Sequence, residues 1–128
     1  MIINSNVVTL SNEKLNDLKK AEPATIGHFR NFNFSTEALF SSIPDKGAIG
    51  RAVTVKLASN DSTLLHKVTE MVGPGDILMI DRAGDQQYAA LGGVVSYALK
   101  VRNVEAVIID GAATDIKEIR EMGLLVFY

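Results

Sequence analysis

Two short apolar runs, each ending in an aspartate, constrain the fold of this chain most strongly. Residues 77–81 read ILMID and residues 106–110 read AVIID, and a loop of small and acidic residues follows each run. A helical pattern follows each loop, and a last apolar run, LLVFY, occupies residues 124–128. Strands that alternate with helices at this short spacing indicate parallel β-α-β units, so we predict an α/β fold.

One further strand and three helices complete the predicted β-α-β part of the chain. Residues 48–57 alternate apolar and polar side chains, which is typical of a strand with one solvated face. The continuous apolar runs instead predict strands covered on both faces of the sheet. Apolar residues at helical spacing and flanking turn residues predict helices over residues 62–72, 86–103 and 116–123.

The chain of 128 residues is long enough for one domain. Residues 1–23 are predicted to be an N-terminal helical segment, and residues 24–128 the α/β core. Within the first segment, Ser11 or Asn12 is placed to cap a helix over residues 13–22.

Composition excludes several classes of function. The net charge of −2 offers no basic surplus for a phosphate backbone, so we expect no nucleic-acid partner. The absence of cysteine removes disulfides and thiolate metal sites, and makes the cytoplasm the expected compartment. No apolar run reaches the roughly 20 residues of a membrane span, and the N-terminus does not read as a signal peptide. We therefore expect no membrane association.

Four aspartates are predicted to gather at one edge of the sheet. Asp81 and Asp110 end the two apolar strands, and Asp85 and Asp115 lie in the loops that follow them. The carboxyl ends of parallel strands meet at the edge where open α/β sheets bind ligands. Each aspartate alone is equally consistent with turn formation, and Asp85 with capping a helix that begins at Gln86.

Asp115 allows two interpretations that the residues alone leave open. It directly precedes the helical pattern IKEIREM, where an aspartate commonly caps the helix and complements its dipole. Its carboxylate also suits Mg²⁺ or Mn²⁺, which often take only one or two protein carboxylates besides water and substrate.

The small-residue stretch ALGGVV, residues 90–95, is ambiguous in the same way. Gly92 and Gly93 allow a helix to pack closely against the sheet, or they leave backbone amides uncovered for an anion at a helix N-terminus. Neither the P-loop pattern nor the dinucleotide fingerprint is present. Arg82, just past the first apolar strand, is placed to bring positive charge to the acidic edge.

Four blocks of the sequence resemble the RraA-like family. This family includes the regulator of ribonuclease activity A and the divalent-metal-dependent 4-hydroxy-4-methyl-2-oxoglutarate aldolases, and its members were often misnamed demethylmenaquinone methyltransferases. The resemblance runs from about Ala24 to Tyr128. The blocks are DSTLLHK, GPGDILMIDRAGD, ALGGVV and VIIDGAATDIKEIREMGLLVF.

The resemblance implies a fold, an assembly and a site. The fold is a swivelling β/β/α sandwich, usually in a homotrimer with active sites between subunits. In the family's aldolases a keto-acid carboxylate lies on backbone amides of the glycine-containing stretch, which here is Gly92, Gly93, Val94 and Val95. An Arg-Asp pair follows the Asp-Gly turn, and its aspartate, here Asp115, binds the metal.

Two positions depart from the aldolase pattern. Thr114 stands where the resemblance implies a substrate-holding arginine, and Gly93 stands where it implies an acid. A threonine has no charge to stabilise an enolate, and a glycine transfers no proton. The implied metal ligand and substrate cradle are thus retained, while the catalytic groups at these two positions are not.

The sequence therefore supports two functions. The first is a Mg²⁺- or Mn²⁺-dependent aldolase-like or decarboxylase-like enzyme acting on a small 2-oxo acid, of the 4-hydroxy-4-methyl-2-oxoglutarate or oxaloacetate type. The second is a non-catalytic regulator that binds a ribonuclease or another protein, which the loss of the arginine at Thr114 favours.

The C-terminal part of the family fold is expected to be missing. Family members continue past the strand equivalent to LLVFY, whereas this chain stops at Tyr128. An apolar strand with nothing after it predicts an exposed sheet edge, unless a neighbouring subunit covers it.

Overall fold

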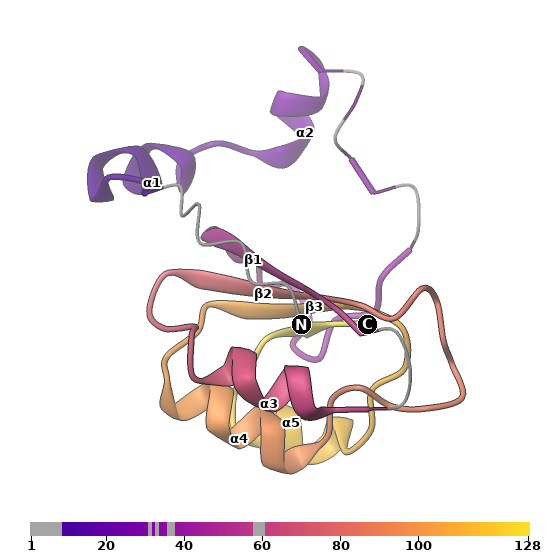
Figure 1. The fold of residues 1–128 in the computed structure, drawn as a ribbon. Coiled ribbons are helices and arrows are strands. Elements are labelled where there is room, and N and C mark those ends of the chain that lie inside the picture. The colour runs from indigo at the N-terminus through magenta and orange to yellow at the C-terminus, as the bar shows by residue number, and fades with distance from the viewer. Residues whose placement is uncertain (1–8, 31, 33, 36–37, 58–60) are drawn as a thin grey trace.

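The computed structural model of the chain describes residues 9–30, 32, 34–35, 38–57 and 61–128 (Figure 1). One parallel sheet forms its centre, with its strands in the order β1-β2-β3-β4. The strands are β1 (Arg51–Lys56), β2 (Asp76–Asp81), β3 (Ala106–Asp110) and β4 (Val126–Phe127). The predicted α/β class with parallel β-α-β units is confirmed.

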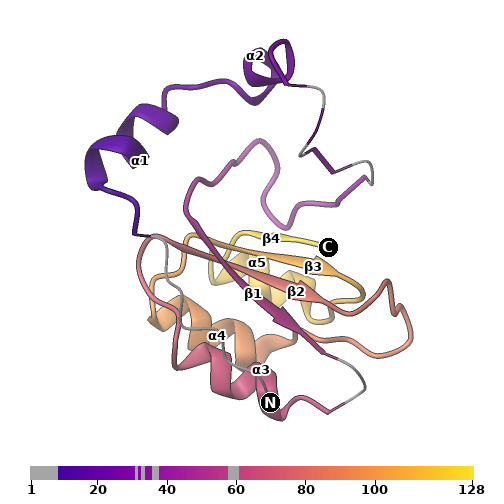
Figure 2. The same cartoon turned by 45° about the horizontal axis from the view of Figure 1, so that its top comes forward.

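Three helices cover one face of this sheet (Figures 1 and 2). They are α3 (Thr63–Thr69), α4 (Gly93–Val101) and α5 (Ile116–Glu121). Each strand pairs with the next one along the chain, and each strand-helix-strand connection has the same handedness. All three connecting helices therefore lie on the same face of the sheet. The core lies between helices and sheet, and its fully buried side chains include Leu65, Leu78, Ile80, Leu91, Leu99, Val107, Ile109, Ile119, Leu124 and Val126.

The opposite face of the sheet is partly open. Ala52 and Thr54 of β1 are exposed there, and the side chain of Met79 on β2 is 37% exposed. The expectation that the apolar strands are covered on both faces is therefore wrong for β2 among the described residues. Each run is continuous in sequence, yet alternate side chains of β2 differ in burial because the helices pack on one face only.

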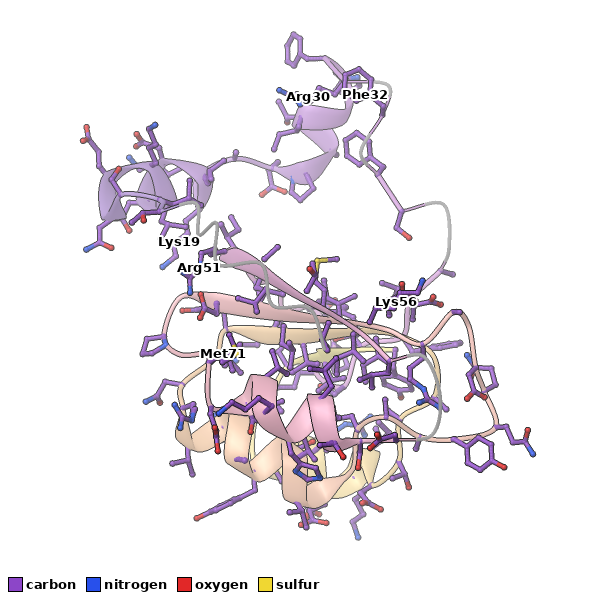
Figure 3. All side chains as sticks on the ribbon, in the orientation of Figure 1. Lys19, Arg30, Phe32, Arg51, Lys56 and Met71 are labelled. Carbon is purple, nitrogen blue, oxygen red and sulfur yellow. The ribbon has the colours of Figure 1, made fainter. Side chains whose placement is uncertain are left out.

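The N-terminal segment stands away from the sheet (Figure 2). It contains α1 (Asn12–Leu18) and α2 (Pro23–Gly27), and neither helix has a buried residue. The backbone amide of Lys14 donates to the Ser11 hydroxyl, so of the two predicted candidates it is Ser11 that caps α1. Figure 3 shows Arg30 and Phe32 projecting beyond α2, far from the core.

The edge of β4 is covered by the chain itself. Residues 40–42 run antiparallel to β4, with Phe40 and Tyr128 exchanging two backbone hydrogen bonds and Ser42 donating to Val126. The prediction of an exposed terminal edge is therefore wrong. Nothing in the sequence of this loop-like segment marks it as a partner for β4, because its pairing joins residues more than eighty positions apart.

The helix predicted over residues 86–103 is shorter in the structure. It begins at Gly93, and residues 86–92 form an extended loop instead. Gly92 is extended, with φ −132° and ψ −172°, which ends the loop at the start of α4. Within the described part of the chain, no helix is long and apolar enough to span a membrane.

Candidate functional site

Two loops at the carboxyl end of the sheet are held side by side. One precedes α4 and the other precedes α5. The amide of Ala90 donates to the carbonyl of Ala112 at 3.0 Å, and the amide of Thr114 donates to the carbonyl of Leu91 at 2.9 Å. Leu91 and Ala113 form a parallel bridge between these bonds. The pairing places residues 92–93 directly against residues 114–115.

Asp115 caps a helix, but not the one that follows it. Its backbone is left-handed, with φ 57°, and its side chain accepts no hydrogen bond from α5. Its Oδ2 instead accepts from the amide of Gly93, at 2.9 Å, across the two loops. The interpretation of Asp115 as the side-chain cap of its own helix is therefore wrong. The paired loops direct its carboxylate to the first turn of α4.

The first turn of α4 has further amides to offer. Gly92, its N-cap, has no side chain that could accept from them. In the described part of the chain, the amides of Val94 and Val95 meet no acceptor, as is general for a helix that lacks a side-chain cap. The side chain of Val94 is exposed. These amides and the helix dipole favour negative charge at this point.

Glu118 is a member of this site that the sequence analysis missed. It lies on the first turn of α5, three residues after Asp115. A Cβ atom built on Gly93 would lie only 2.7 Å from Glu118 Oε2. The Glu118 carboxylate thus occupies the space that a side chain at residue 93 would need. The spacing from Asp115 was visible in the sequence, but the contact with Gly93 depends on the loop pairing.

The two carboxylates of this site lack a cationic partner within the described part of the chain. Thr114, which stands at the position where an arginine was expected, places its hydroxyl 3.2 Å from Asp115 Oδ1. Among the described residues, neither Asp115 nor Glu118 forms an ion pair with a lysine or arginine. The site therefore combines free amides with uncompensated acidic oxygens.

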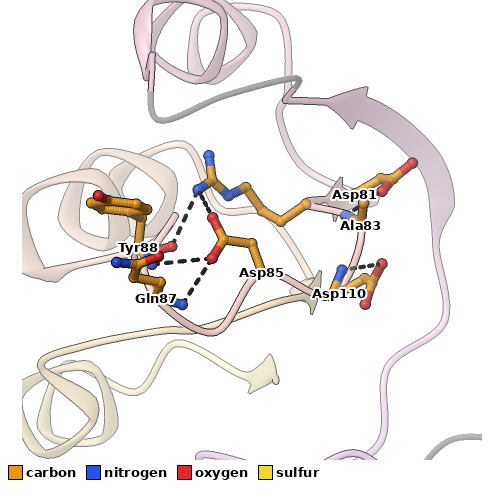
Figure 4. Close-up of polar contacts among 8 residues, drawn as sticks. Asp81, Ala83, Asp85, Gln87, Tyr88 and Asp110 are labelled. Atoms are coloured by element: carbon orange, nitrogen blue, oxygen red, sulfur yellow. Dashed lines mark hydrogen bonds and ion pairs between the residues drawn. The ribbon is translucent and has the colours of Figure 1, made fainter.

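The aspartates that end β2 and β3 act as turn residues. Asp81 and Asp110 are register partners, so they lie at the same edge as predicted. Asp81 accepts from the amide of Ala83 and pairs with Lys56 at 2.8 Å, and both contacts lower its pKa, that with Lys56 most strongly. Asp110 accepts from the amide of Gly84 at 3.1 Å (Figure 4). Lys56 is visible at the end of β1 (Figure 3).

Asp85 stabilises the loop rather than a helix. Its Oδ1 accepts from the amides of Gln87 and Tyr88, and its Oδ2 pairs with Arg82 at 2.5 Å (Figure 4). The Gln87 amide, followed by Arg82 and Tyr88, lowers the pKa of this carboxyl. The prediction that Asp85 caps a helix beginning at Gln86 is wrong, because the helix begins later.

Arg82 brings its charge inward, to a pocket at the end of the sheet. Its side chain is only 4% exposed. It lines a pocket of about 380 Å³ together with Leu57, Ser62 and residues 87–90. Because Arg82 is engaged by Asp85, the positive charge expected at the acidic edge is neutralised locally and does not reach Asp115.

The donors at the paired loops suit a hard cation with few protein ligands. Among the described residues, no three histidine, cysteine or acidic side chains are grouped to hold a metal. The predicted meeting of four aspartates thus yields no such group. Asp115 and the Thr114 hydroxyl offer only oxygen donors beside Gly92 and Gly93. This set fits Mg²⁺ or Mn²⁺, which keep water and bind through one or two carboxylates.

Comparison with known sequences yields one family. A sequence profile of the RraA-like family, described as Aldolase/RraA, matches residues 13–128. The chain is 35% identical over 78 residues to a 4-hydroxy-4-methyl-2-oxoglutarate aldolase of Thermus thermophilus, covering 59% of this chain and 47% of that protein. The chain spans less than half the length of the curated relatives it matches, between 38% and 47%.

Solved structures share the fold. A protein from Geobacillus kaustophilus, described as S-adenosylmethionine: 2-dimethylmenaquinone methyltransferase, is 28% identical with a TM-score of 0.65, over 71% of this chain and 56% of that one. The RNA-processing inhibitor RraA from Thermus thermophilus has a TM-score of 0.74 at 24% identity, over 84% of this chain and 66% of that one.

Proposed function

The chain belongs to the RraA-like family, and we propose that it is a divalent-metal-dependent lyase that cleaves a small 2-oxo acid of the 4-hydroxy-4-methyl-2-oxoglutarate or oxaloacetate type. The observation that carries this proposal is the loop pair, which joins an aspartate to the open first turn of a helix. Aldolase names among the relatives support the substrate class.

Asp115 is the proposed metal-binding residue, with the Thr114 hydroxyl beside it. Mg²⁺ or Mn²⁺ bound there would supply a Lewis acid that stabilises negative charge on a substrate oxygen. These side chains leave most coordination positions to water and substrate, as the chemistry of a 2-oxo acid requires.

The amides of Gly93, Val94 and Val95 are the proposed cradle for the substrate carboxylate, at the positive end of α4. The Gly93 amide is engaged by Asp115, and Glu118 lies against Gly93. An incoming carboxylate therefore faces two negative side chains and, among the described residues, no compensating arginine. We expect the oxo acid to bind only after a divalent cation at Asp115 has offset this negative charge.

Methyl transfer is not proposed, although one structural relative is described as a methyltransferase. The sequence has no glycine-rich loop followed by an acid that would bind the ribose of S-adenosylmethionine.

The experiment is a pyruvate assay on the full chain with 4-hydroxy-4-methyl-2-oxoglutarate and, separately, oxaloacetate. We expect pyruvate with Mg²⁺ or Mn²⁺, none with EDTA, and loss of activity in Asp115→Asn. We also propose that the chain forms a homotrimer, as expected from the family resemblance, and sedimentation velocity on the same sample tests this. A folded protein that releases no pyruvate above the metal-only background excludes this function.

A second candidate function is a non-catalytic regulator that binds a ribonuclease or another protein. Thr114 favours it, because this residue supplies no charge to a developing enolate. Affinity capture with the immobilised chain tests it: specific recovery of a ribonuclease from a homologous lysate, with no pyruvate formed in the assay above, supports regulation over catalysis.

A further inference from the structure

Glu118 reaches from α5 to the start of α4, where its carboxylate lies against Gly93. The Cβ position of residue 93 would lie 2.7 Å from Glu118 Oε2, 3.0 Å from its Cδ and 3.1 Å from its Oε1. These atoms are the flexible end of an exposed side chain, which can move for a larger residue at position 93. With glycine at position 93, the Glu118 carboxylate lies directly against the first turn of α4.

Asp115 and Glu118 differ in their contacts, and this difference indicates different roles. Asp115 is held by the Gly93 amide through Oδ2 and by the Thr114 hydroxyl through Oδ1. Glu118, in the described part of the chain, has neither a hydrogen bond nor an ion pair from its side chain. It is exposed and lies against the amide cradle. The Glu118 carboxylate is therefore accessible to a molecule bound at this cradle.

The proposed cleavage needs such a group. In 4-hydroxy-4-methyl-2-oxoglutarate a base must take the proton of the C4 hydroxyl as the C3–C4 bond breaks. C4 becomes the carbonyl carbon of one pyruvate, and the electron pair of the broken bond forms the enolate of a second. A proton added to C3 of that enolate then completes the second pyruvate.

We propose that Glu118 is the proton-transfer group of this site, taking the hydroxyl proton and returning it to C3. The proposal rests on the function proposed above. It assigns proton transfer to a residue of α5, since Gly93 has no side chain that could carry a proton. Asp115 remains the metal-binding residue, so the two carboxylates act on different steps.

The test removes the carboxylate from residue 118 and then introduces one at residue 93. We expect Glu118→Gln to lower kcat for pyruvate release by about two orders of magnitude or more, as for loss of a general acid–base group. KM and the Mn²⁺ affinity, read by electron paramagnetic resonance, stay close to the wild-type values. Glu118→Ala behaves in the same way. Adding Gly93→Asp to Glu118→Ala restores about tenfold or more of the lost rate, because the new carboxylate starts from the position that Glu118 vacates.

Glu121→Gln is the matched control, since it removes the same group from the exposed part of the same helix and leaves kcat unchanged. A Glu118→Gln variant that retains the wild-type kcat overturns the inference and leaves the proposed function standing. Failure of Gly93→Asp to rescue a folded Glu118→Ala protein also overturns it. A wild-type chain that releases no pyruvate overturns both.

Discussion

At the scale of single residues, Asp115 combines three physical roles. It adopts a left-handed backbone conformation, which aspartate and asparagine tolerate better than other non-glycine residues. It caps α4 from outside that helix, through the 2.9 Å hydrogen bond from Gly93. Under the proposed function it also binds the metal. Structural and functional interpretations of this residue are therefore not alternatives.

The first prediction separates these roles by substitution of Asp115. Asparagine keeps an oxygen acceptor and tolerates the left-handed conformation, so Asp115→Asn should change the free energy of unfolding by less than about 0.5 kcal/mol. Asp115→Ala loses the cap and should destabilise by about 1 kcal/mol. Both variants should bind Mn²⁺ more weakly. Urea unfolding and Mn²⁺ titration measure the two effects, and unchanged metal affinity in both variants would exclude Asp115 as a ligand.

Asp85 leads to a prediction on pH dependence. The Gln87 amide and the Arg82 guanidinium lower its pKa from the ordinary value of 3.8 in the folded state. A lowered folded pKa stabilises the protein above the unfolded pKa, and this contribution is lost as pH falls through the folded value. We expect the free energy of unfolding to fall less steeply below about pH 4 in Asp85→Asn than in the wild type. Equal slopes in both proteins would contradict this account, and Asp17→Asn on α1 is the control.

At the scale of helices and strands, the periodicity of apolar residues predicted most elements. Hydrogen bonds between distant segments determine the features that it did not predict. The alternating and apolar runs identified β1, β2 and β3 because burial sets those patterns directly. The start of α4 and the cover of β4 were not predictable. Both depend on hydrogen bonds between distant segments, the 90–93 and 112–115 loops in one case and residues 40–42 with β4 in the other.

The candidate site divides in the same way. The positions of Asp115 and of the Gly92–Gly93 stretch could be read from the sequence, since a strand end and a helix start leave local signatures. Glu118 could not, because its relation to Gly93 exists only after the two loops pair. The prediction that Asp85 caps a helix was wrong for a different reason. The sequence pattern placed the start of this helix at Gln86, whereas α4 begins at Gly93.

Ser42 provides a prediction at this scale. Its buried hydroxyl donates to the carbonyl of Leu124 and accepts from the amide of Val126, each at 2.9 Å. Ser42→Ala leaves both groups buried without these partners, so we expect a loss of about 1–3 kcal/mol in unfolding free energy. Ser41→Ala is the matched control. Its half-buried hydroxyl hydrogen-bonds, among the described residues, to the backbone of Ile43, two residues away. Equal losses in the two variants would show that residue 42 does not hold the β4 edge.

At the scale of the whole molecule, the fold concentrates its ligand-binding potential at one edge. Helices cover one face of the sheet, and every strand points its carboxyl end to the same side. At that edge Asp81, Asp85 and Asp110 are engaged by loop amides or by cations. In the described part of this edge, carboxylates and open amides remain together at the loop pair around Gly93, so this pair carries the proposed function.

The central claim is that this loop pair binds a divalent cation and an oxo acid in that order. Oxalate mimics the pyruvate enolate. Calorimetric titration of the full chain with oxalate therefore tests the claim most directly. We predict binding heat in the presence of Mg²⁺, no heat in EDTA, and no heat in Asp115→Asn with Mg²⁺. Oxalate binding that is equally strong without the metal, or that persists in Asp115→Asn, would contradict the account.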